Sequence, residues 1–418
     1  MPDRSVVVTG IGPVTPIGIG VDAFWQGATT GRNGIAPIAR FDTSDLPVTL
    51  AGDVRDFDVS RWLDAKEARR TDRFTHYAVA AADLAWEDAG KPEVESDRGS
   101  VVFATGIGGI EWLLNQHSVL LEKGPGRVSP FMVPALMANA AAGHIAMRMG
   151  LTGPNFCTVS ACASGAHAVG EGYRLIRDGY ADVAIVGGSE AATLPLTVAA
   201  FAQMTALTRN GDPETASRPF DADRDGFVLS EGACALVLER EAAARARGAT
   251  IYAAVVGYGA SDDAFHITAP DPKGNGAAIA IRRALEDAGA EPSAVDYVNA
   301  HGTSTPLNDA SETNALKAAL GEEVAHDVAV SSTKSMTGHM LGAAGAVEAS
   351  ICALAIDRGV IPPTIHYRTP DPDCDLDYVP NEAREADVRL AISNSFGFGG
   401  QNAVVALGKP AQRPDEPA

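Results

Sequence analysis

The sequence has few cysteines, and this shortage excludes two classes of protein. The five cysteines among 418 residues lie at positions 157, 162, 234, 352 and 374, without the paired spacing of metal ligands. An odd number of cysteines, mostly in apolar stretches, is typical of free thiols in a reducing compartment. We therefore expect neither a disulfide framework nor a zinc site.

Positive charge is also scarce, because 33 Lys and Arg residues face 53 Asp and Glu residues and leave a formal net charge of −20. Nucleic-acid binding needs a basic surface, so this balance argues against a nucleic-acid partner. Only a local basic patch could receive an acidic partner.

Long apolar runs are missing as well. No run reaches membrane-spanning length, and Met1-Pro2-Asp3-Arg4 leads directly into an apolar strand without a signal-peptide pattern. We expect a cytoplasmic protein that does not enter a membrane.

What the sequence does contain is a regular alternation of apolar strands and helices. A first cycle has predicted strands at 5–9, 100–105, 155–159, 181–188 and 233–239, with a helical pattern at 63–89. A second cycle has predicted strands at 251–259, 295–301, 328–332, 389–393 and 402–407, with helices at 275–289 and 340–357. This alternation predicts parallel sheets covered on both faces, in two similar halves with one active site between them. We divide the chain into an N-terminal half at 1–250, a C-terminal half at 251–408 and a disordered tail at 409–418.

Cys162 stands where an apolar strand ends and a helix begins. The N–H groups and positive dipole of a helix N-terminus favour a thiolate, and small neighbouring residues would let a substrate approach the sulfur. We interpret Cys162 as a nucleophile. An inert buried cysteine is the alternative, and the setting of this residue alone does not decide between the two.

Three more junctions between a strand and a loop hold groups suited to catalysis. They are His301 in 299–305, Lys334 and His339 in 331–339, and the glycine-rich loop at 394–400. Loops at the carboxyl ends of strands converge in a doubly wound sheet, so these groups can meet Cys162. Each has a structural alternative, namely a buried histidine, a solvated lysine or a loop that needs positive φ angles. Their joint occurrence favours catalysis, and a cysteine-protease interpretation would leave the second histidine and the lysine without a role.

These motifs match a known family. The matching segments are Ala161-Cys162-Ala163-Ser164-Gly165, Arg218-Pro219-Phe220-Asp221, Asn299-Ala300-His301-Gly302-Thr303-Ser304-Thr305, Ser332-Thr333-Lys334-Ser335-Met336-Thr337-Gly338-His339 and Asn394-Ser395-Phe396-Gly397-Phe398-Gly399-Gly400. From about residue 5 to 408 the chain resembles the β-ketoacyl-acyl carrier protein synthases, and most of all their synthase II branch. The resemblance implies an α/β, thiolase-like fold of five αβαβα layers from two related halves. It also implies a homodimer formed through the N-terminal half.

The resemblance assigns the catalytic roles. Cys162 would take the acyl chain as a thioester, with the backbone N–H groups of Cys162 and Phe398 as oxyanion hole. His301 and His339 would donate hydrogen bonds to the thioester oxygen of the malonyl substrate. Lys334 would pair with Glu348, and Phe398 would also gate the site.

Binding roles follow from the same resemblance. Thr303 and Thr305 would hold the phosphopantetheine arm that arrives on the acyl carrier protein, and no other cofactor is expected. The chain pocket, with other substrate contacts, would involve Ile107, Met132, Phe201 and Phe396. The best candidate for a carrier-docking patch is the run of cations Lys66, Arg69, Arg70 and Arg73, with Arg127 as a second contact. Of these, Arg69 and Arg70 match docking positions of the family, and an ordinary solvated helix face is the alternative. A structural Na⁺ or K⁺ would lie at Asn299, Glu348 and Asn394.

The implied activity is decarboxylative condensation of acyl-carrier with malonyl-carrier to 3-oxoacyl-carrier, in fatty-acid elongation. A ketosynthase of a type II polyketide system needs the same chemistry and stays an open alternative. A non-condensing partner subunit of this fold would lack the nucleophile. A thiolase would need a second cysteine, which is missing from Gly397-Phe398-Gly399-Gly400.

Overall fold

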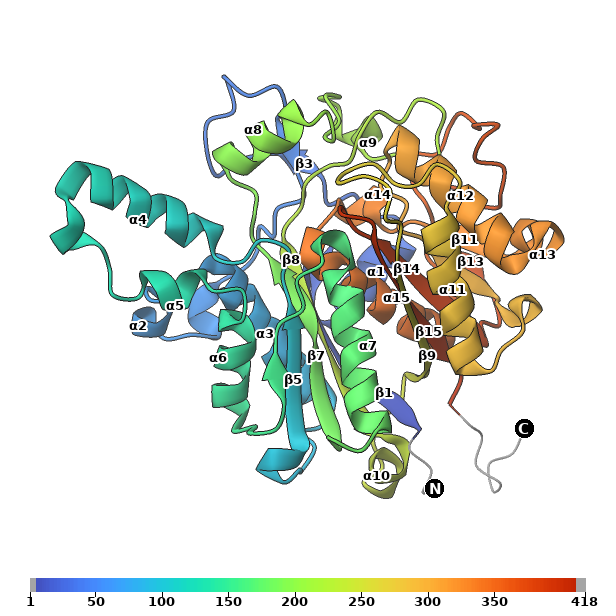
Figure 1. Cartoon of the computed structure of the whole chain (residues 1–418), viewed down its shortest axis with the longest axis horizontal. Helices are drawn as coiled ribbons and strands as arrows, with labels where there is room; N and C mark the ends of the chain where they lie inside the picture. Colours follow the sequence, from blue (N-terminus) through green and yellow to red (C-terminus); the bar gives the residue numbers. More distant parts are fainter. Residues whose placement is uncertain (1–4, 411–418) are drawn as a thin grey trace.

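The computed structural model describes residues 5–410 (Figure 1). The long strands coincide with the apolar runs of the sequence: β1 (Val6–Thr15), β7 (Val183–Glu190) and β8 (Gly232–Arg240) are buried along almost their whole length. Strands without an exposed face must lie inside a layered molecule, covered on both sides.

The remaining elements of the N-terminal half connect these strands. They are β2 (Gly18–Ile19), α1 (Val21–Thr29), β3 (Ala36–Pro37), β4 (Leu50–Ala51), η1 (Val59–Arg61), α2 (Ala65–Ala68), α3 (Arg73–Asp88), η2 (Ser96–Arg98), β5 (Gly99–Ala104), α4 (Ile110–Lys123), η3 (Pro125–Arg127), α5 (Met132–Leu136), α6 (Ala140–Met149), β6 (Asn155–Phe156), η4 (Ala161–Ala163), α7 (Ser164–Arg177), α8 (Pro195–Gln203), α9 (Pro213–Ala216) and α10 (Glu241–Ala246).

The C-terminal half follows the same plan. Its elements are β9 (Ala253–Asp262), α11 (Asn275–Ala288), η5 (Pro292–Ala294), β10 (Tyr297–Asn299), α12 (Pro306–Leu320), α13 (Glu322–Asp327), β11 (Ala329–Ser331), α14 (Lys334–Thr337), η6 (Leu341–Ala343), α15 (Ala344–Arg358), β12 (Val360–Ile361), β13 (Arg384–Glu385), β14 (Leu390–Phe396) and β15 (Gln401–Gly408).

Strand order reveals an internal repeat. The N-terminal strands lie in the order β1-β8-β7-β5-β6 and the C-terminal strands in the order β9-β15-β14-β10-β11. In each set the first two pairings are antiparallel and the last two are parallel. Antiparallel pairing of β1 with β9 joins the two sets. The two halves therefore share one topology.

Five layers result from this arrangement. Helices α3 and α6 cover the outer face of the first sheet, and α11 and α12 lie on the outer side of the second. Between the sheets α7 packs against α15, where every residue from Ala344 to Ile356 is buried. A helix that is apolar on all sides is typical of such a central layer. The predicted thiolase-like αβαβα fold is confirmed.

The two central helices begin in the same way. Each follows a 3-10 turn whose first residue has a positive φ angle, Ala161 (φ 49) before α7 and Leu341 (φ 45) before α15. Cys162 is the second residue of the first turn, and Gly342 has the matching place in the second. The repeat thus directs two helix N-termini toward one region, and only one of them carries a nucleophile.

Three expectations about the elements are wrong. The sheets are mixed, because β8 and β15 run antiparallel to their neighbours. The predicted buried strand at 155–159 is the two-residue strand β6, which is exposed. The predicted helix at 63–89 is split into α2 and α3, because Asp64 and Asp72 each cap the start of a new helix.

Other expectations concern the chain as a whole. The five cysteines are free thiols, as predicted. Searching residues 5–410 finds no helix that could cross a membrane. The domain boundary at 250 stays a prediction, and the predicted tail at 409–418 lies, from residue 411 on, outside the described residues.

Candidate active site

The turn that carries Cys162 is fixed by one serine side chain. Ser164 Oγ accepts a hydrogen bond from Ser160 N (2.7 Å) and donates one to Ala161 O (2.7 Å). These bonds hold the positive φ angle of Ala161, which turns the next residue toward the cavity. Cys162 is 6% exposed, so its sulfur meets only what enters that cavity.

The glycine-rich loop lies directly against this turn. A Cβ atom on Gly397 would be 2.6 Å from Ser160 O and 3.3 Å from Cys162 N, so glycine alone allows this approach. The next residue, Phe398, directs its backbone N–H at the Cys162 sulfur. In the predicted oxyanion hole, this N–H and that of Cys162 would face the acyl oxygen, and this role stays a prediction.

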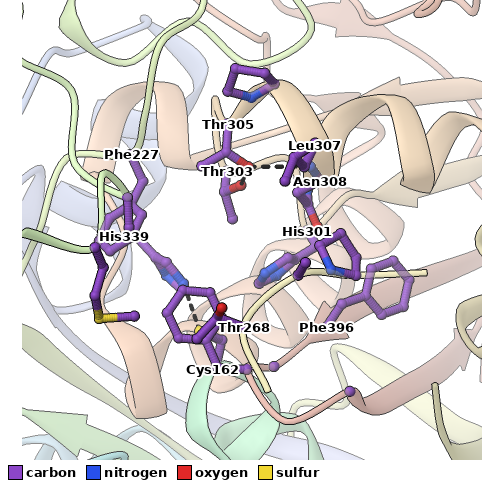
Figure 2. Close-up of a pocket in the computed structure, with 18 of the residues that line it drawn as sticks. Cys162, Phe227, Thr268, His301, Thr303, Thr305, Leu307, Asn308, His339 and Phe396 are labelled. Carbon is purple, nitrogen blue, oxygen red and sulfur yellow. Dashed lines mark hydrogen bonds between the residues drawn. The ribbon is translucent and has the colours of Figure 1, made fainter. Parts of the chain in front are cut away.

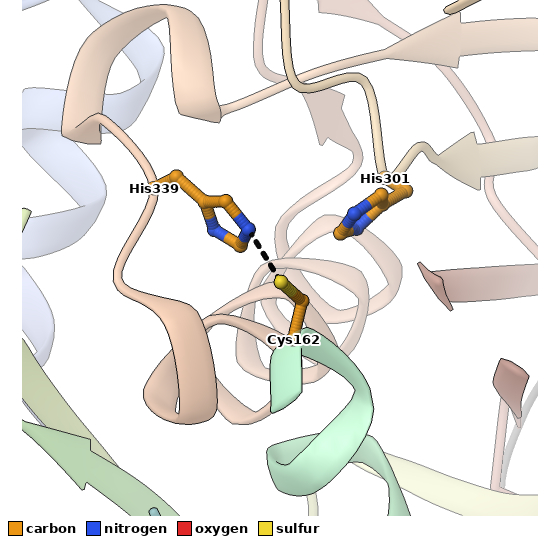
Figure 3. A group of neighbouring side chains, drawn as sticks. All are labelled: Cys162, His301 and His339. Carbon is orange, nitrogen blue, oxygen red and sulfur yellow. Dashed lines mark hydrogen bonds between the residues drawn. The ribbon is translucent and has the colours of Figure 1, made fainter. Parts of the chain in front are cut away.

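His339 contacts the nucleophile directly. Its Nε2 lies 3.0 Å from Cys162 Sγ. Figure 3 marks this contact with a dashed line. The backbone of His339 is held on one side, by His339 N donating to Val228 O (2.8 Å) and by Ser230 N donating to His339 O (3.0 Å). Its Nδ1 is buried without a hydrogen-bond partner among the described residues, so no neighbour fixes the tautomer of this ring.

His301 is held differently, by a buried lysine. Lys334 Nζ lies 3.4 Å from His301 Nδ1 and donates to His301 O (2.6 Å). An ammonium group only donates, so Nδ1 must accept and the ring proton of neutral His301 resides on Nε2. The histidine rings are 5.4 Å apart at 83°, and ligand-type atoms of Cys162, His301 and His339 all lie within 4.8 Å of one another.

Burial keeps these three groups neutral. Desolvation raises the pKa of the Cys162 thiol to about 12, although the Lys334 charge and the Phe398 N–H oppose the shift. Desolvation, together with the Lys334 charge, holds the pKa of His301 and of His339 well below 6.5. Both directions oppose the thiolate expected from the helix dipole and favour a thiol whose sulfur lies against the Nε2 of a neutral imidazole.

Lys334 forms the predicted ion pair. Its Nζ contacts Glu348 Oε1, and the two side chains are only 2% and 3% exposed. Burial raises the pKa of Glu348 to about 7 although Lys334 stabilises its charge. The pair therefore places a cation behind His301 and fixes which nitrogen of that ring faces the cavity.

A cavity of about 350 Å³ opens above these groups (Figure 2). Cys162, His301, His339, Phe396 and Phe398 line it. Thr303 and Thr305 line it too, with their Oγ1 atoms 2.9 Å apart. The structure thus brings together every predicted catalytic residue except Lys334, which supports the cavity from behind.

Ile107, Met132 and Phe201 do not line this cavity. Phe201 instead packs edge to face on Phe227, whose ring lies against His339. Their role in holding an acyl chain stays a prediction.

The predicted docking residues divide into two groups. Lys66, Arg69, Arg70 and Arg127 are exposed, and no ion pair to another described residue is formed by them. Arg73 does not belong to this surface, because its Nη2 binds the buried carboxylate of Glu231 at 2.6 Å. A residue of the docking patch must keep its charge available, so we correct the assignment of Arg73.

Two buried glutamates were not predicted. Glu312 accepts from His301 N (2.8 Å) and Gly302 N (2.7 Å) and so sets the loop that carries His301. Glu190 accepts from Gly106 N (2.7 Å) and Gly342 N (3.0 Å), joining the loops on either side of Cys162. Glu312 lies between Ser311 and Thr313 on α12, so its local sequence gives no sign of burial, and Glu190 simply ends the buried strand β7.

The predicted cation residues leave three buried oxygens unpaired. Asn299 Oδ1, Asn394 Oδ1 and Glu348 Oε2 have no hydrogen-bond partner among the described residues. Glu312 links Asn394 to the loop that carries His301, since it accepts from Asn394 Nδ2 at 3.1 Å. Unpaired oxygens of this kind are the ligands that hard cations prefer.

Known proteins match the chain over nearly its whole length. The family model of the β-ketoacyl synthase N-terminal domain matches residues 3–244, and that of the C-terminal domain matches residues 252–368. The 3-oxoacyl-[acyl-carrier-protein] synthase 2 of Synechocystis sp. is 53% identical, over 97% of this chain and 98% of the relative. The protein of the same name from Staphylococcus aureus (strain COL) is 50% identical, over 97% and 99%.

Solved structures agree. The ishigamide ketosynthase/chain length factor superimposes with a TM-score of 0.91 at 40% identity, over 98% of this chain and 100% of that chain. A β-ketoacyl synthase from Burkholderia phymatum STM815 gives 0.89 at 36% identity, over 97% and 100%. A type II polyketide acyl-carrier protein in complex with its ketosynthase gives 0.89 at 34%, over 98% and 100%. With the topology and the Cys162, His301 and His339 geometry described above, these matches establish that the chain belongs to the β-ketoacyl synthase family.

Proposed function

We propose that the protein is a type II β-ketoacyl-acyl carrier protein synthase of fatty-acid elongation. It joins an acyl group from one carrier to the two-carbon unit of malonyl-carrier, releases carbon dioxide and forms 3-oxoacyl-carrier. The observation that carries this proposal is Cys162 Sγ at 3.0 Å from His339 Nε2 with His301 on the far side of one cavity. The names of the relatives at 50–53% identity support the reaction.

The first half-reaction loads the enzyme. His339 Nε2 accepts the thiol proton of Cys162, and the sulfur attacks the carbonyl carbon of the acyl thioester. Negative charge develops on the carbonyl oxygen, which the N–H groups of Cys162 and Phe398 stabilise. The carbon–sulfur bond to the carrier arm then breaks, and the departing thiolate takes the proton from His339.

The second half-reaction needs hydrogen-bond donors, whereas the first needs a proton acceptor. His301 presents Nε2–H because Lys334 occupies its Nδ1 side, and His339, whose tautomer no described neighbour fixes, can present Nε2–H as well. Both stabilise the enolate oxygen while the electrons of the breaking carbon–carbon bond enter the enolate and carbon dioxide leaves. The enolate carbon attacks the acyl carbonyl on Cys162, and the cysteine sulfur departs and regains a proton.

Substitution of the nucleophile tests this division of roles. Cys162→Gln should form no condensation product but should still release carbon dioxide from malonyl-carrier, because the amide imitates an acylated cysteine and both histidines stay in place. Cys157→Ser is the matched control, because Cys157 does not line the cavity. Product analysis and carbon dioxide release are measured together. A folded Cys162→Gln variant that has lost both activities would contradict the proposal.

A ketosynthase of a polyketide system is the second candidate. The likeness to the ishigamide ketosynthase/chain length factor at 40% identity favours it. Intact mass of the enzyme after incubation with carriers of both kinds, bearing acyl groups of different lengths, distinguishes the two. Preferential adducts from saturated acyl-carriers support fatty-acid elongation, and preferential adducts from polyketide carriers support the alternative.

An acyl carrier protein is the proposed partner, received by Lys66, Arg69, Arg70 and Arg127. Carrier proteins are acidic, so a chain with net charge −20 can bind one only at a concentrated cationic patch. The solved complex of a related ketosynthase with its acyl-carrier protein supports this partner. For its location we propose the cytoplasm, which agrees with five free thiols.

A second copy of the chain is proposed as the other partner. Helix α4 has no buried residue, and the side chain of its Leu121 is 72% exposed. Farther along the chain, Val133 is 59% exposed and Phe156 is 37% exposed. These exposed apolar residues lie on α4, on α5 and on β6, which is the edge strand of its sheet. Such an edge and face favour association. Light scattering should give twice the monomer mass, and Leu121→Asp should lower it.

We further propose that Asn299, Asn394 and Glu348 would hold a monovalent cation. The three buried oxygens without a hydrogen-bond partner are suitable cation ligands. The two buried carboxylates of Glu312 and Glu348 are accompanied by one ammonium group, that of Lys334. A bound cation would balance this charge. Replacing Na⁺ and K⁺ by tetramethylammonium should lower the melting temperature, and K⁺ should restore it. An Asn394→Ala variant should not respond.

A further inference from the structure

Glu231 is a buried acid that the reaction does not use. Its side chain is fully buried and accepts from Arg73 Nη2 (2.6 Å), Tyr77 OH (2.7 Å) and Arg40 Nη1 (3.3 Å). One carboxylate thus meets two guanidinium groups and a phenol. Contacts of this density indicate that the position of Glu231 is set closely.

The backbone next to Glu231 is the segment that holds His339. Leu229 and His339 form a parallel bridge, Ser230 N donates to His339 O (3.0 Å), and His339 N donates to Val228 O (2.8 Å). On its other side the segment bonds to Gly52, through Gly52 N to Leu229 O (3.0 Å) and Glu231 N to Gly52 O (3.0 Å). Residues 228–231 therefore lie between Gly52 and His339.

The position of the His339 ring depends on this backbone, whereas the His301 ring is also held by a side chain. The ring of His301 is held through Nδ1 by Lys334, whereas Nδ1 of His339 has no hydrogen-bond partner among the described residues. The main remaining restraints on His339 are its edge-to-face contact with Phe227 (5.2 Å) and the backbone bonds to residues 228–230. A shift of that segment would move Nε2 directly relative to Cys162 Sγ.

The charges around Glu231 leave little freedom to replace it. Arg73 is otherwise stacked on Tyr77 (5.0 Å), and Arg40 also pairs with Glu111 at 3.2 Å. Neutralising the carboxylate would leave the guanidinium groups of Arg73 and Arg40 with the neighbouring acids Asp53 and Glu111, and the two cations would reorganise toward those acids or water. That reorganisation would occur one residue away from Ser230, whose N–H donates to His339 O.

We infer that Glu231 is a positioning residue for His339: its ion pairs with Arg73 and Arg40 fix the 228–231 segment, which sets the distance from His339 Nε2 to the substrate and to Cys162. The inference rests on the proposed role of His339 as a hydrogen-bond donor in decarboxylation. A misplacement of about 1 Å is enough to lower a rate by roughly 10²-fold.

Glu231→Gln tests the inference, because it keeps the shape and removes the charge. In the Cys162→Gln background, kcat for decarboxylation of malonyl-carrier should fall about tenfold or more, and KM should stay within about twofold. In the background with Cys162, alkylation of this thiol by iodoacetamide should slow at least about threefold, because Nε2 leaves the sulfur. Tyr77→Phe is the matched control, since it removes one neutral donor to the same carboxylate and should change each value less than about twofold.

The outcomes separate the possibilities. If Cys162→Gln alone does not decarboxylate malonyl-carrier, the proposed function fails, and the alkylation rate still tests Glu231. If Glu231→Gln melts near wild type and keeps both rates, or if Tyr77→Phe lowers them equally, the inference is wrong. If Glu231→Gln does not fold, Arg73→Lys replaces it. This variant keeps the positive charge but shortens the side chain, which weakens the contact with Glu231. The kcat for decarboxylation should therefore fall at least about threefold, and an unchanged kcat would overturn the inference.

Discussion

At the scale of single residues, burial decides the chemistry of the site. A cysteine at a helix N-terminus is expected to ionise easily, yet desolvation raises the pKa of Cys162 to about 12. The same burial holds the pKa of His339 well below 6.5 and keeps its ring neutral, so Nε2 can accept a hydrogen bond from the thiol. The nucleophile is therefore activated by its neighbour when substrate arrives, and is not stored as a thiolate.

The two histidines should therefore differ in the loading step. The helix-dipole argument alone predicts that His301→Ala and His339→Ala both become acylated. Because only His339 contacts the sulfur, we expect acylation of Cys162 within about threefold of wild type for His301→Ala, and a loss of about 10²-fold or more for His339→Ala, typical of a missing general base. Both should lose decarboxylation. Intact mass against time gives the acylation rates, and equal rates in the two variants would restore the dipole argument.

The pH dependence of alkylation follows from the same pKa. A thiol releases its proton as pH rises, so below a pKa of about 12 the thiolate fraction grows roughly tenfold for each pH unit. We expect the iodoacetamide rate at Cys162 to rise from about pH 7 to about pH 9 without a plateau. The Cys162 peptide must be quantified by mass, because Cys157 also titrates, with a pKa raised to about 11. A plateau near neutral pH would mean that the thiolate is stabilised after all.

At the scale of elements, sequence patterns locate most strands and none of their directions. Long apolar runs such as β7 and β8 can be recognised as strands in the sequence, because both faces of each strand are buried. Direction in a sheet depends on pairing between distant segments, and the antiparallel β8 has the pattern of a parallel strand because both of its faces are covered. The segment at 155–159 misleads the strand prediction because Phe156 and Val159 are apolar but exposed.

The catalytic residues are predictable for a local reason. Cys162, His301, Lys334 and His339 each stand in a loop after an apolar stretch, where packing of the core seldom requires a reactive side chain. Glu231 and Arg73 show the limit of such reasoning, because their ion pair joins positions 158 residues apart. Arg73 has the sequence setting of one more exposed cation on a helix, and only the fold reveals the acid that it meets.

The contact between two elements at the oxyanion hole can be tested at one glycine. Gly397→Ala would place a Cβ atom 2.6 Å from Ser160 O, so the loop at 397–400 must move away from η4 and take the Phe398 N–H with it. Loss of one oxyanion donor costs about 10²–10³-fold in rate, so acylation of Cys162 should slow by that order. Gly126→Ala is the matched control, since a Cβ atom there meets nothing within 4 Å. Normal acylation in folded Gly397→Ala would contradict the assigned donor.

At the scale of the whole molecule, the internal repeat accounts for one site serving two half-reactions. The N-terminal half supplies the nucleophile at the start of α7, and the C-terminal half supplies both histidines and the glycine-rich loop at 394–400. Because α7 and α15 pack side by side between the sheets, the loops at their N-termini share one cavity. The pairing of the two halves thus brings residues 162 and 339, one from each half, within a hydrogen bond of each other.

The last prediction concerns how this acidic molecule receives an acidic carrier. Arg69→Glu with Arg70→Glu removes the centre of the exposed cationic patch, so KM for acyl-carrier should rise about tenfold, and its increase with ionic strength should flatten. Turnover of a short acyl-pantetheine thioester, which presents no protein surface, should stay within about twofold of wild type.

Arg282→Glu with Arg283→Glu is the matched control for this variant. It reverses two neighbouring exposed arginines of α11 in the other half of the molecule and changes the net charge by the same amount. If net charge alone governed encounter, both double variants would raise KM for acyl-carrier equally. If Arg69 and Arg70 form the docking patch, only their reversal should do so, because screening limits an exposed charge to about 10 Å at about 0.1 M salt. If both double variants showed equal kinetics with acyl-carrier, the docking site would have to lie elsewhere on the surface.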